Sequence, residues 1–101
     1  MRRFGKLDAN QKRIADRLRL EGWSVASTAS LGNGFPDVLV GAEGHNVLLE
    51  IKNGDLSPSR RTLTPGEVDF VRRWHGQVAV VENEEQALAV VLDFIRRPRE
   101  R

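Results

Sequence analysis

The chain has 101 residues, no cysteine, and 16 Lys and Arg against 14 Asp and Glu, a formal net charge of +2. This length predicts one domain over residues 1–101, and the lack of cysteine excludes a disulfide framework or a thiolate zinc site. No apolar run approaches the ~18 residues of a membrane span, and the first residues do not resemble a signal peptide, so we expect a cytoplasmic protein without a membrane partner.

The charges are grouped along the chain. Residues 1–20 carry seven basic and two acidic side chains, whereas the charged side chains of residues 82–95 are all acidic. Arginine outnumbers lysine thirteen to three, and arginine binds phosphate through two parallel hydrogen bonds. A nucleic-acid partner is one interpretation of this pattern. The other is a set of ordinary solvated faces in an arginine-rich chain.

The first half of the chain predicts one helix followed by three strands. Apolar residues recur at helical spacing over 9–21, with Asp8 as the expected N-cap and Gly22 as the stop. Alternating apolar residues then predict strands, interrupted by a glycine-rich loop and by one short turn. These strands are expected over residues 23–27, 37–41 and 47–52. The second and third should form an antiparallel hairpin.

The second half predicts a helix, a strand and a helix after a polar loop over 53–63. Thr64-Pro-Gly-Glu67 is typical of a capping box and should open a helix that runs to about Trp74. Residues 77–81 are nearly all apolar, which predicts a strand in the centre of the sheet, covered on both faces. A second capping box over 83–86 should open the last helix.

The predicted order of elements is α-β-β-β-α-β-α. It indicates an α/β fold in which a small mixed sheet is flanked by helices. Residues 1–7 and 96–101 are expected to be flexible ends of this domain.

The predicted hairpin brings charged side chains together at the end of an apolar strand. Glu50 and Lys52 are two residues apart and therefore point to the same face. If Gly41 pairs with Asn46, Asp37 falls opposite Glu50, and the two carboxylates lie within ~5.5 Å of each other. One of these carboxyl groups should then titrate at high pH unless a cation lies between them.

A hard divalent cation such as Mg²⁺ would relieve this repulsion, because it binds carboxylate and carbonyl oxygens and also substrate phosphates. The expected ligands are Asp37, Glu50 and the carbonyl of Ile51. Lys52 would orient or deprotonate a water, or stabilise negative charge developing on phosphorus. The alternative is an ordinary surface ion pair of Lys52. Glu67 is expected either to close its capping box alone or to face the same site as well.

Contacts with a DNA backbone are expected from two basic segments, one at the N-terminus and one in the 53–63 loop. Gly34 belongs to a loop whose amides could approach a phosphate, although such a glycine often only permits a positive φ. The expected contact residues are Arg2, Arg3, Lys6, Lys12, Arg13, Gly34, Arg60 and Arg61. Trp23 and Trp74 are expected in the core or at an interface rather than stacked on bases.

Three segments together resemble the PD-(D/E)XK nuclease superfamily, and more closely its VRR-NUC and phage Holliday-junction-resolvase-like branch. They are Gly34-Phe-Pro-Asp37, Leu49-Glu-Ile-Lys52 and Leu63-Thr-Pro-Gly-Glu67. The likeness extends over nearly the whole chain, and the order of elements matches a restriction-endonuclease-like core.

The resemblance implies roles for individual residues. Asp37 and Glu50 would be metal ligands, Lys52 the catalytic lysine, and Glu67 a catalytic residue at the start of the following helix. Members of this family tend to carry a further acidic residue on the first helix. The candidates here are Asp8, Asp16 and, as a polar substitute, Asn10.

We therefore expect a DNA endonuclease that uses Mg²⁺, or alternatively Mn²⁺, and no other cofactor, in a bacterial cell or a phage-infected host. Its substrate would be branched DNA such as a Holliday junction. Since so short a core covers little of a duplex, we expect a homodimer, formed near the helix over 64–74 or the last helix. The alternatives are a non-catalytic module that recognises DNA structure and a protein-interaction domain without nucleic acid.

Overall fold

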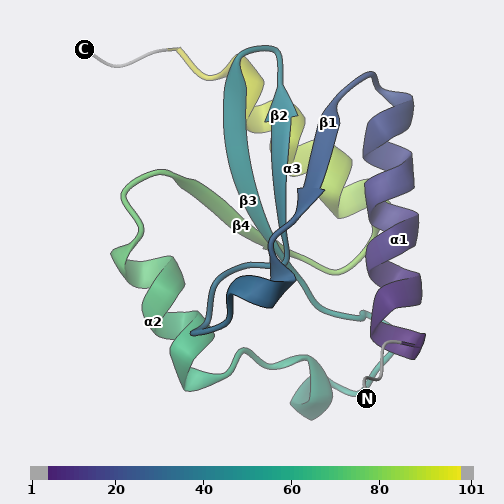
Figure 1. Cartoon of the computed structure of the whole chain (residues 1–101), viewed down its shortest axis with the longest axis vertical. Coiled ribbons are helices and arrows are strands. Elements are labelled where there is room, and N and C mark those ends of the chain that lie inside the picture. Colours follow the sequence, from purple (N-terminus) through teal and green to yellow (C-terminus); the bar gives the residue numbers. More distant parts are fainter. Residues whose placement is uncertain (1–4, 99–101) are drawn as a thin grey trace.

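The computed structural model describes residues 5–98 (Figure 1). It confirms the α/β class and the predicted order of helices and strands, and it adds two short 3-10 helices, η1 and η2, that were not predicted. The elements are α1 (Gly5–Leu20), β1 (Ser24–Ser27), η1 (Ala29–Leu31), β2 (Val38–Ala42), β3 (His45–Ile51), η2 (Pro58–Arg61), α2 (Pro65–Arg73), β4 (Gln77–Val81) and α3 (Glu84–Arg96). None of the helices within residues 5–98 has both the length and the hydropathy needed to cross a membrane.

The four strands form one sheet in the order β1-β2-β3-β4. The first three strands pair antiparallel and β4 pairs parallel to β3. Gly41 pairs with Asn46, as predicted. The hairpin turns at Glu43 and Gly44, whose φ values of 51° and 84° are those of a two-residue turn that matches the twist of the strands. The register on which the site prediction depends is therefore confirmed.

The hydrophobic core lies between one face of the sheet and the pair of helices α1 and α3 (Figure 1). Alternation along β2 and β3 sends every second side chain to this face. The largest contributions come from Ile14, Leu18, Val38, Val40, Val47, Leu49, Val81 and Val91, all fully buried. Burying these side chains holds α1 and the ends of β2 and β3 in fixed relative positions, which is what the site requires.

The prediction that residues 77–81 form a central strand was wrong. In the described sheet β4 lies at the edge and pairs with β3 alone. Its apolar run arises because α3 covers one face, where Val81 is buried, while Val80 on the opposite face stays 39% exposed. Strand β4 returns parallel to β3 after the crossover through α2, and such long-range pairing leaves no local signal in the sequence.

The predicted helix starts are partly confirmed. The described residues are helical from Gly5 onward, so Asp8 lies inside α1 and the interpretation of Asp8 as its N-cap was wrong. Both hydrogen bonds of the predicted capping box between Thr64 and Glu67 are present at α2. At α3, Asn83 accepts from the Gln86 amide, but the Gln86 side chain accepts from the amide of Glu82.

Candidate active site

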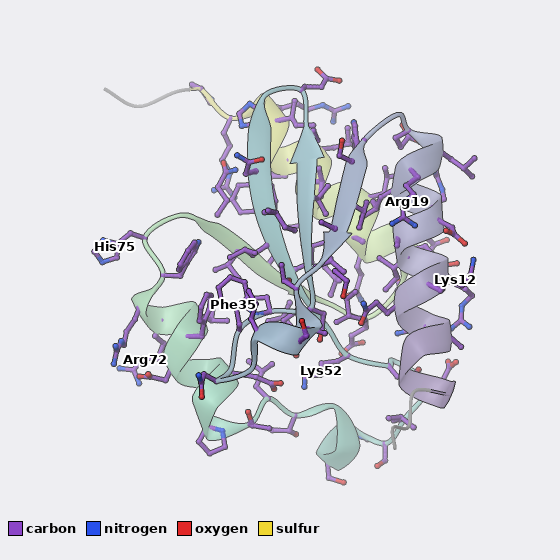
Figure 2. The ribbon with its side chains drawn as sticks, viewed as in Figure 1. Lys12, Arg19, Phe35, Lys52, Arg72 and His75 are labelled. Carbon is purple, nitrogen blue, oxygen red and sulfur yellow. The ribbon has the colours of Figure 1, made fainter. Side chains whose placement is uncertain are left out.

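A cavity of about 180 Å³ lies where the ends of β2 and β3, the N-terminus of α2 and the first half of α1 come together. Figure 2 shows Lys52 at this end of the sheet, between α1 and α2. The lining residues are Asn10, Gln11, Asp37, Glu50, Ile51, Lys52, Asn53, Leu56 and Glu67. The structure thus brings together the five residues singled out for catalysis and metal binding, from segments up to 30 positions apart in the chain.

Asp37 directly precedes β2 and is held by two hydrogen bonds to β3. Its register continues the pairing of Val38 with Leu49, which sets it beside Glu50. The Asp37 amide donates to the carbonyl of Leu49 at 3.0 Å, and its Oδ2 accepts from the amide of Ile51 at 2.8 Å. The Asp37 carboxylate thus binds the backbone of β3 and also lines the cavity.

Glu50 and Lys52 occupy the same face of β3, as alternation requires. The Glu50 side chain is nearly inaccessible, with the residue only 3% exposed. The Nζ of Lys52 lies 3.3 Å from Oε2 of Glu50 and 2.8 Å from Oε1 of Glu67. One ammonium group is thus shared between two carboxylates that come from different elements.

Glu67 has both of the roles considered from the sequence: it closes the capping box and it faces the site. Its Oε1 accepts the backbone amide of Thr64 at 2.9 Å, which closes the capping box, and the same oxygen accepts from Lys52. The helix start therefore fixes the position of the carboxylate, and the carboxylate fixes the position of the lysine.

The acid-base properties of the cavity follow from burial and from crowded charges. Burial raises the pKa of Glu50 to about 8, and the charges of Asp37 and Glu67 act in the same direction. Burial likewise raises the pKa of Asp37, against the opposing effect of the Ile51 amide. For Lys52, burial acts to lower the pKa, but the bond to Glu67 and the charge of Glu50 outweigh it, so the net pKa is raised.

Glu67 responds in the opposite way. Burial acts to raise its pKa, but the hydrogen bonds from Lys52 and from the Thr64 amide outweigh that effect and leave the pKa lowered. The cavity therefore holds one firmly ionised carboxylate, one firmly charged amine, and a buried carboxyl group at Glu50 that keeps its proton near neutral pH.

The donors in the cavity are the kind that a hard cation prefers. Within residues 5–98, no three His, Cys, Asp or Glu side chains are arranged to hold a metal ion. The oxygen donors in the cavity that could hold a cation are the carboxyl groups of Asp37 and Glu50 and the carbonyl of Ile51. The amide and carbonyl of one strand residue point to the same side, so this carbonyl faces the side of Asp37, where the Ile51 amide is bound. Two carboxylates with a carbonyl and several waters fit Mg²⁺.

Among the three candidates that the sequence offered on α1, Asn10 is the one that lines the cavity. It is 5% exposed, donates from Nδ2 to the carbonyl of Lys52 at 3.4 Å, and accepts at Oδ1 from Arg13 at 2.9 Å. Asp16 instead pairs with Lys12 and Arg19 on the solvent side of the helix. The side chain of Asp8 lies outside the described part of the chain.

Sequence reasoning missed Gln11, Asn53 and Leu56 as lining residues of this cavity. A signal for the α1 contribution was present, because Asn10 lies four and eight positions before the buried Ile14 and Leu18, on the same helix face. A polar residue on an otherwise apolar stripe marks the point where the helix leaves the core for a site. The loop residues Asn53 and Leu56 carry no such pattern.

The residues expected to contact DNA are placed only in part. Lys12 is exposed on α1 and bonded to Asp16 at 2.7 Å, and Arg13 is bonded to Asn10. The remaining five basic residues are less fully described. Arg2 and Arg3 lie outside the described residues, as do the side chains of Lys6 on α1 and of Arg60 and Arg61 on η2.

Gly34 lies at a close approach between the loop before Asp37 and the start of α2. Its φ is +80°, and a Cβ added there would lie 2.5 Å from the carbonyl oxygen of Gly66. Packing therefore accounts for this glycine without a ligand, and its predicted contact with DNA stays a prediction.

The two tryptophans have different environments. Trp23 is buried in the core, whereas Trp74 at the end of α2 is 42% exposed. Trp74 stacks on Phe70 with the ring centroids 5.0 Å apart, and Phe35 packs edge-on against both rings. This cluster attaches α2 to the loop that leads to Asp37, so it supports the site from the side opposite α1 (Figure 2).

Comparison with known proteins finds a solved structure with a similar fold. No protein-family model matches the chain, and no curated protein does. A solved structure described as "VRR_NUC domain" matches with a TM-score of 0.62 and 22% sequence identity, over 86% of this chain and 95% of that one. The chain therefore has the fold of a VRR_NUC domain, and the fold expected from the motifs is confirmed.

Proposed function

We propose that this chain is a metal-dependent endonuclease that hydrolyses phosphodiester bonds in DNA. The observation that carries the proposal is the convergence of Asp37, Glu50 and Lys52 in one cavity of a domain with the VRR_NUC fold. An ordinary surface ion pair needs neither a carboxyl group that is 3% exposed nor a lysine shared by two acids. Burying such groups costs stability, and active sites are where such costs are usually found.

Asp37, Glu50 and the Ile51 carbonyl would hold Mg²⁺, with Mn²⁺ as the other ion that suits the same oxygen donors. When bound, such an ion polarises the phosphate and lowers the pKa of a coordinated water. No other cofactor is proposed.

Lys52 would act as a fixed positive charge beside the scissile phosphate. Because its pKa is raised, the ammonium form dominates at neutral pH, which suits stabilisation of negative charge on the phosphoryl oxygens rather than proton abstraction. Glu67 would be a positioning residue, which orients Lys52 through the 2.8 Å contact.

Branched DNA, with the Holliday junction as one example, is the proposed substrate, and a homodimer is the proposed active form. A second copy would supply a second site for symmetric cuts. Exposed apolar side chains on α2 and β4, namely Val68, Trp74 and Val80, support an interface near α2. Light scattering at concentrations on the order of tens of micromolar tests this, because a dimer then dominates unless its dissociation constant is higher; a monomer would contradict it.

The proposed phosphate contacts are Lys12 and Arg13 on α1, together with Arg2, Arg3, Lys6, Gly34, Arg60 and Arg61. They would act on the DNA backbone and so carry little sequence information.

The decisive experiment is a panel of end-labelled duplex, nicked, flap and four-way-junction DNAs, incubated with Mg²⁺, Mn²⁺ or EDTA. We expect cleavage that requires metal and is lost in Asp37→Asn and Lys52→Ala. Cleavage that survives both substitutions would reject the site. Salt-sensitive binding that ignores EDTA and yields no product on any DNA would instead indicate a non-catalytic binding module.

A further inference from the structure

A second and larger cleft adjoins the candidate active site. It has a volume of about 520 Å³ and lies between α1, β1 and η1. Its lining residues are Gln11, Lys12, Ala15, Arg19, Val25, Ser27, Ala29, Ser30 and Val38. We call it the α1–β1 cleft. None of the roles proposed so far uses it, apart from the general phosphate contact of Lys12.

The α1–β1 cleft lies next to the catalytic cavity, since Val38 of the cleft directly follows Asp37 of the cavity. Gln11 lines both spaces. Gln11, Ala15 and Arg19 are spaced four residues apart and so lie along one face of α1. With a rise of about 1.5 Å per residue, they cover about 12 Å of helix. The cleft therefore extends along α1 from the neighbourhood of the proposed metal ligands.

The chemistry of the cleft suits a nucleotide chain. Its floor is apolar, formed by Ala15, Val25 and Val38, and can pack against a sugar or a base. Its rim carries the cations Lys12 and Arg19 and the hydroxyl groups of Ser27 and Ser30. Phosphates are commonly bound by this combination of Lys or Arg with Ser, and grooves that follow a single strand combine positive charge with surfaces that accept bases.

The cations on the rim are available to a phosphate. Asp16 accepts from Lys12 at 2.7 Å and from Arg19 at 3.3 Å, and these side chains are 75% and 52% exposed. Exposed pairs of this kind contribute little and are screened by salt, so the one carboxylate leaves a net positive charge on the rim. Arg19 also donates to the carbonyl of Val25 at 3.0 Å, which holds it toward β1 (Figure 2).

We propose that the α1–β1 cleft holds an unpaired DNA strand immediately beside the scissile phosphate. This inference rests on the proposed nuclease function and names its substrate class: DNA with a single-stranded segment next to the cut, such as a splayed arm or a flap. A cleft of this volume is of the size that binds small molecules (~300–1,000 Å³). This volume suits one or two nucleotides of a single strand and is much smaller than a segment of stacked duplex.

Binding measurements on the full chain carrying Lys52→Ala test the inference without requiring cleavage. A labelled single-stranded oligonucleotide and the matching blunt duplex are titrated by fluorescence anisotropy. We expect the added pair Lys12→Ala and Arg19→Ala to weaken single-strand binding about tenfold. The slope of log K against log salt should fall by about 1.4, or about 0.7 for each lost phosphate contact.

The matched control removes two exposed arginines from the end of α3, Arg96→Ala with Arg97→Ala. It changes the net charge equally, and we expect less than about a twofold effect, since screening limits distant charges. Equal losses in the two double variants, or a duplex bound as tightly as the single strand, would overturn the inference.

A second test uses the absence of cysteine from the chain. Ala29→Cys introduces one thiol at an exposed position in the cleft, and Ala89→Cys introduces one at an exposed position on α3. The single strand should slow maleimide labelling at position 29 several-fold and leave position 89 unchanged. Equal labelling with and without DNA at position 29 would exclude a strand in the cleft.

The two proposals fail separately. If the strand protects position 29 but no DNA is cut with either metal, the nuclease function fails and the cleft remains a strand-binding site. If flap or splayed-arm DNA is cut at an unchanged rate by the chain carrying only Lys12→Ala and Arg19→Ala, the nuclease function stands and the inference about the cleft fails.

Discussion

The Nζ of Lys52 lies 2.8 Å from Oε1 of Glu67, and that same oxygen accepts the backbone amide of Thr64. The start of α2 and the end of β3 are thus joined through a single carboxylate oxygen. Glu67, which caps α2, therefore also determines where the candidate catalytic lysine is held.

Glu67→Gln should separate these two duties. Glutamine can still close a capping box, but it no longer gives Lys52 a charged partner. We expect single-turnover cleavage to fall roughly 10–100-fold, as for other groups that orient a catalytic side chain, with little change in melting temperature. Glu67→Ala should lose the cap as well and cost a further ~1 kcal/mol of stability. Unchanged cleavage in Glu67→Gln would remove Glu67 from the site.

Asp37→Asn and Lys52→Ala should both lose DNA cleavage, but for different reasons. Asp37→Asn removes a ligand, so Mn²⁺ affinity measured by calorimetry should drop roughly 10–100-fold or more. Lys52→Ala leaves the oxygen donors in place, so the affinity should stay within a few-fold while cleavage falls about 10²–10³-fold. Loss of metal binding in Lys52→Ala would mean that the lysine supports the metal site and not the reaction.

The stability of the metal-free protein should depend on pH through Glu50. Its pKa is about 8 in the folded chain against an ordinary value of 4.5. Within that window the folded state keeps a proton that the unfolded state has released, so the free energy of unfolding falls as pH rises. We expect a loss on the order of 2–4 kcal/mol across the window, measured by denaturation in EDTA.

Glu50→Gln should abolish most of this slope, because an amide is neutral at every pH in the window. The variant should therefore be more stable than the native chain above about pH 8, while it no longer cleaves DNA. Glu85→Gln, which changes an exposed acid on α3, is the control and should keep the native slope. Parallel pH profiles for Glu50→Gln and the native chain would show that the pKa of Glu50 is not raised in the folded chain.

Gly34→Ala should be more damaging than Gly32→Ala, although both glycines have positive φ. At Gly32 a Cβ meets no atom within 4 Å, whereas at Gly34 it would collide with the backbone of Gly66. Gly32 has φ 71° and ψ −168°, a region almost restricted to glycine, so we expect roughly 1–3 kcal/mol lost there from the backbone alone. At Gly34 we expect a further loss of roughly 1–3 kcal/mol from the collision, together with reduced cleavage. Equal losses in denaturant titrations would mean that the loop can move away from α2.

The parts of the fold that could be predicted are those specified by neighbouring residues. The pairing of Gly41 with Asn46 follows from a short turn between two alternating segments, and it alone sets Asp37 beside Glu50. The Thr64 cap follows from four consecutive residues. These local rules were enough to assemble most of the candidate site before any long-range contact was known.

The features that could not be predicted depend on contacts between distant segments. The edge position of β4 depends on which strand its crossover reaches, and residues 77–81 contain nothing that decides this. Asn10 enters the cavity because α1 packs on the sheet at one particular angle. The local sequence does not specify that angle, so it does not decide among Asp8, Asn10 and Asp16. Asn53 and Leu56 reach the cavity through the course of a loop.

Helix α2 contains no buried residue among those described, and its described attachments are the Lys52 contact, the close approach of Gly34 to Gly66, and the Phe35–Phe70–Trp74 cluster. Segments with so little buried area open at a much lower free energy than the sheet that carries them. Amide protons of α2 should therefore exchange with solvent well before those of β2 and β3. Each such opening withdraws Glu67 from Lys52 and leaves Glu50 as the acidic neighbour of the lysine, while both proposed metal ligands stay in place.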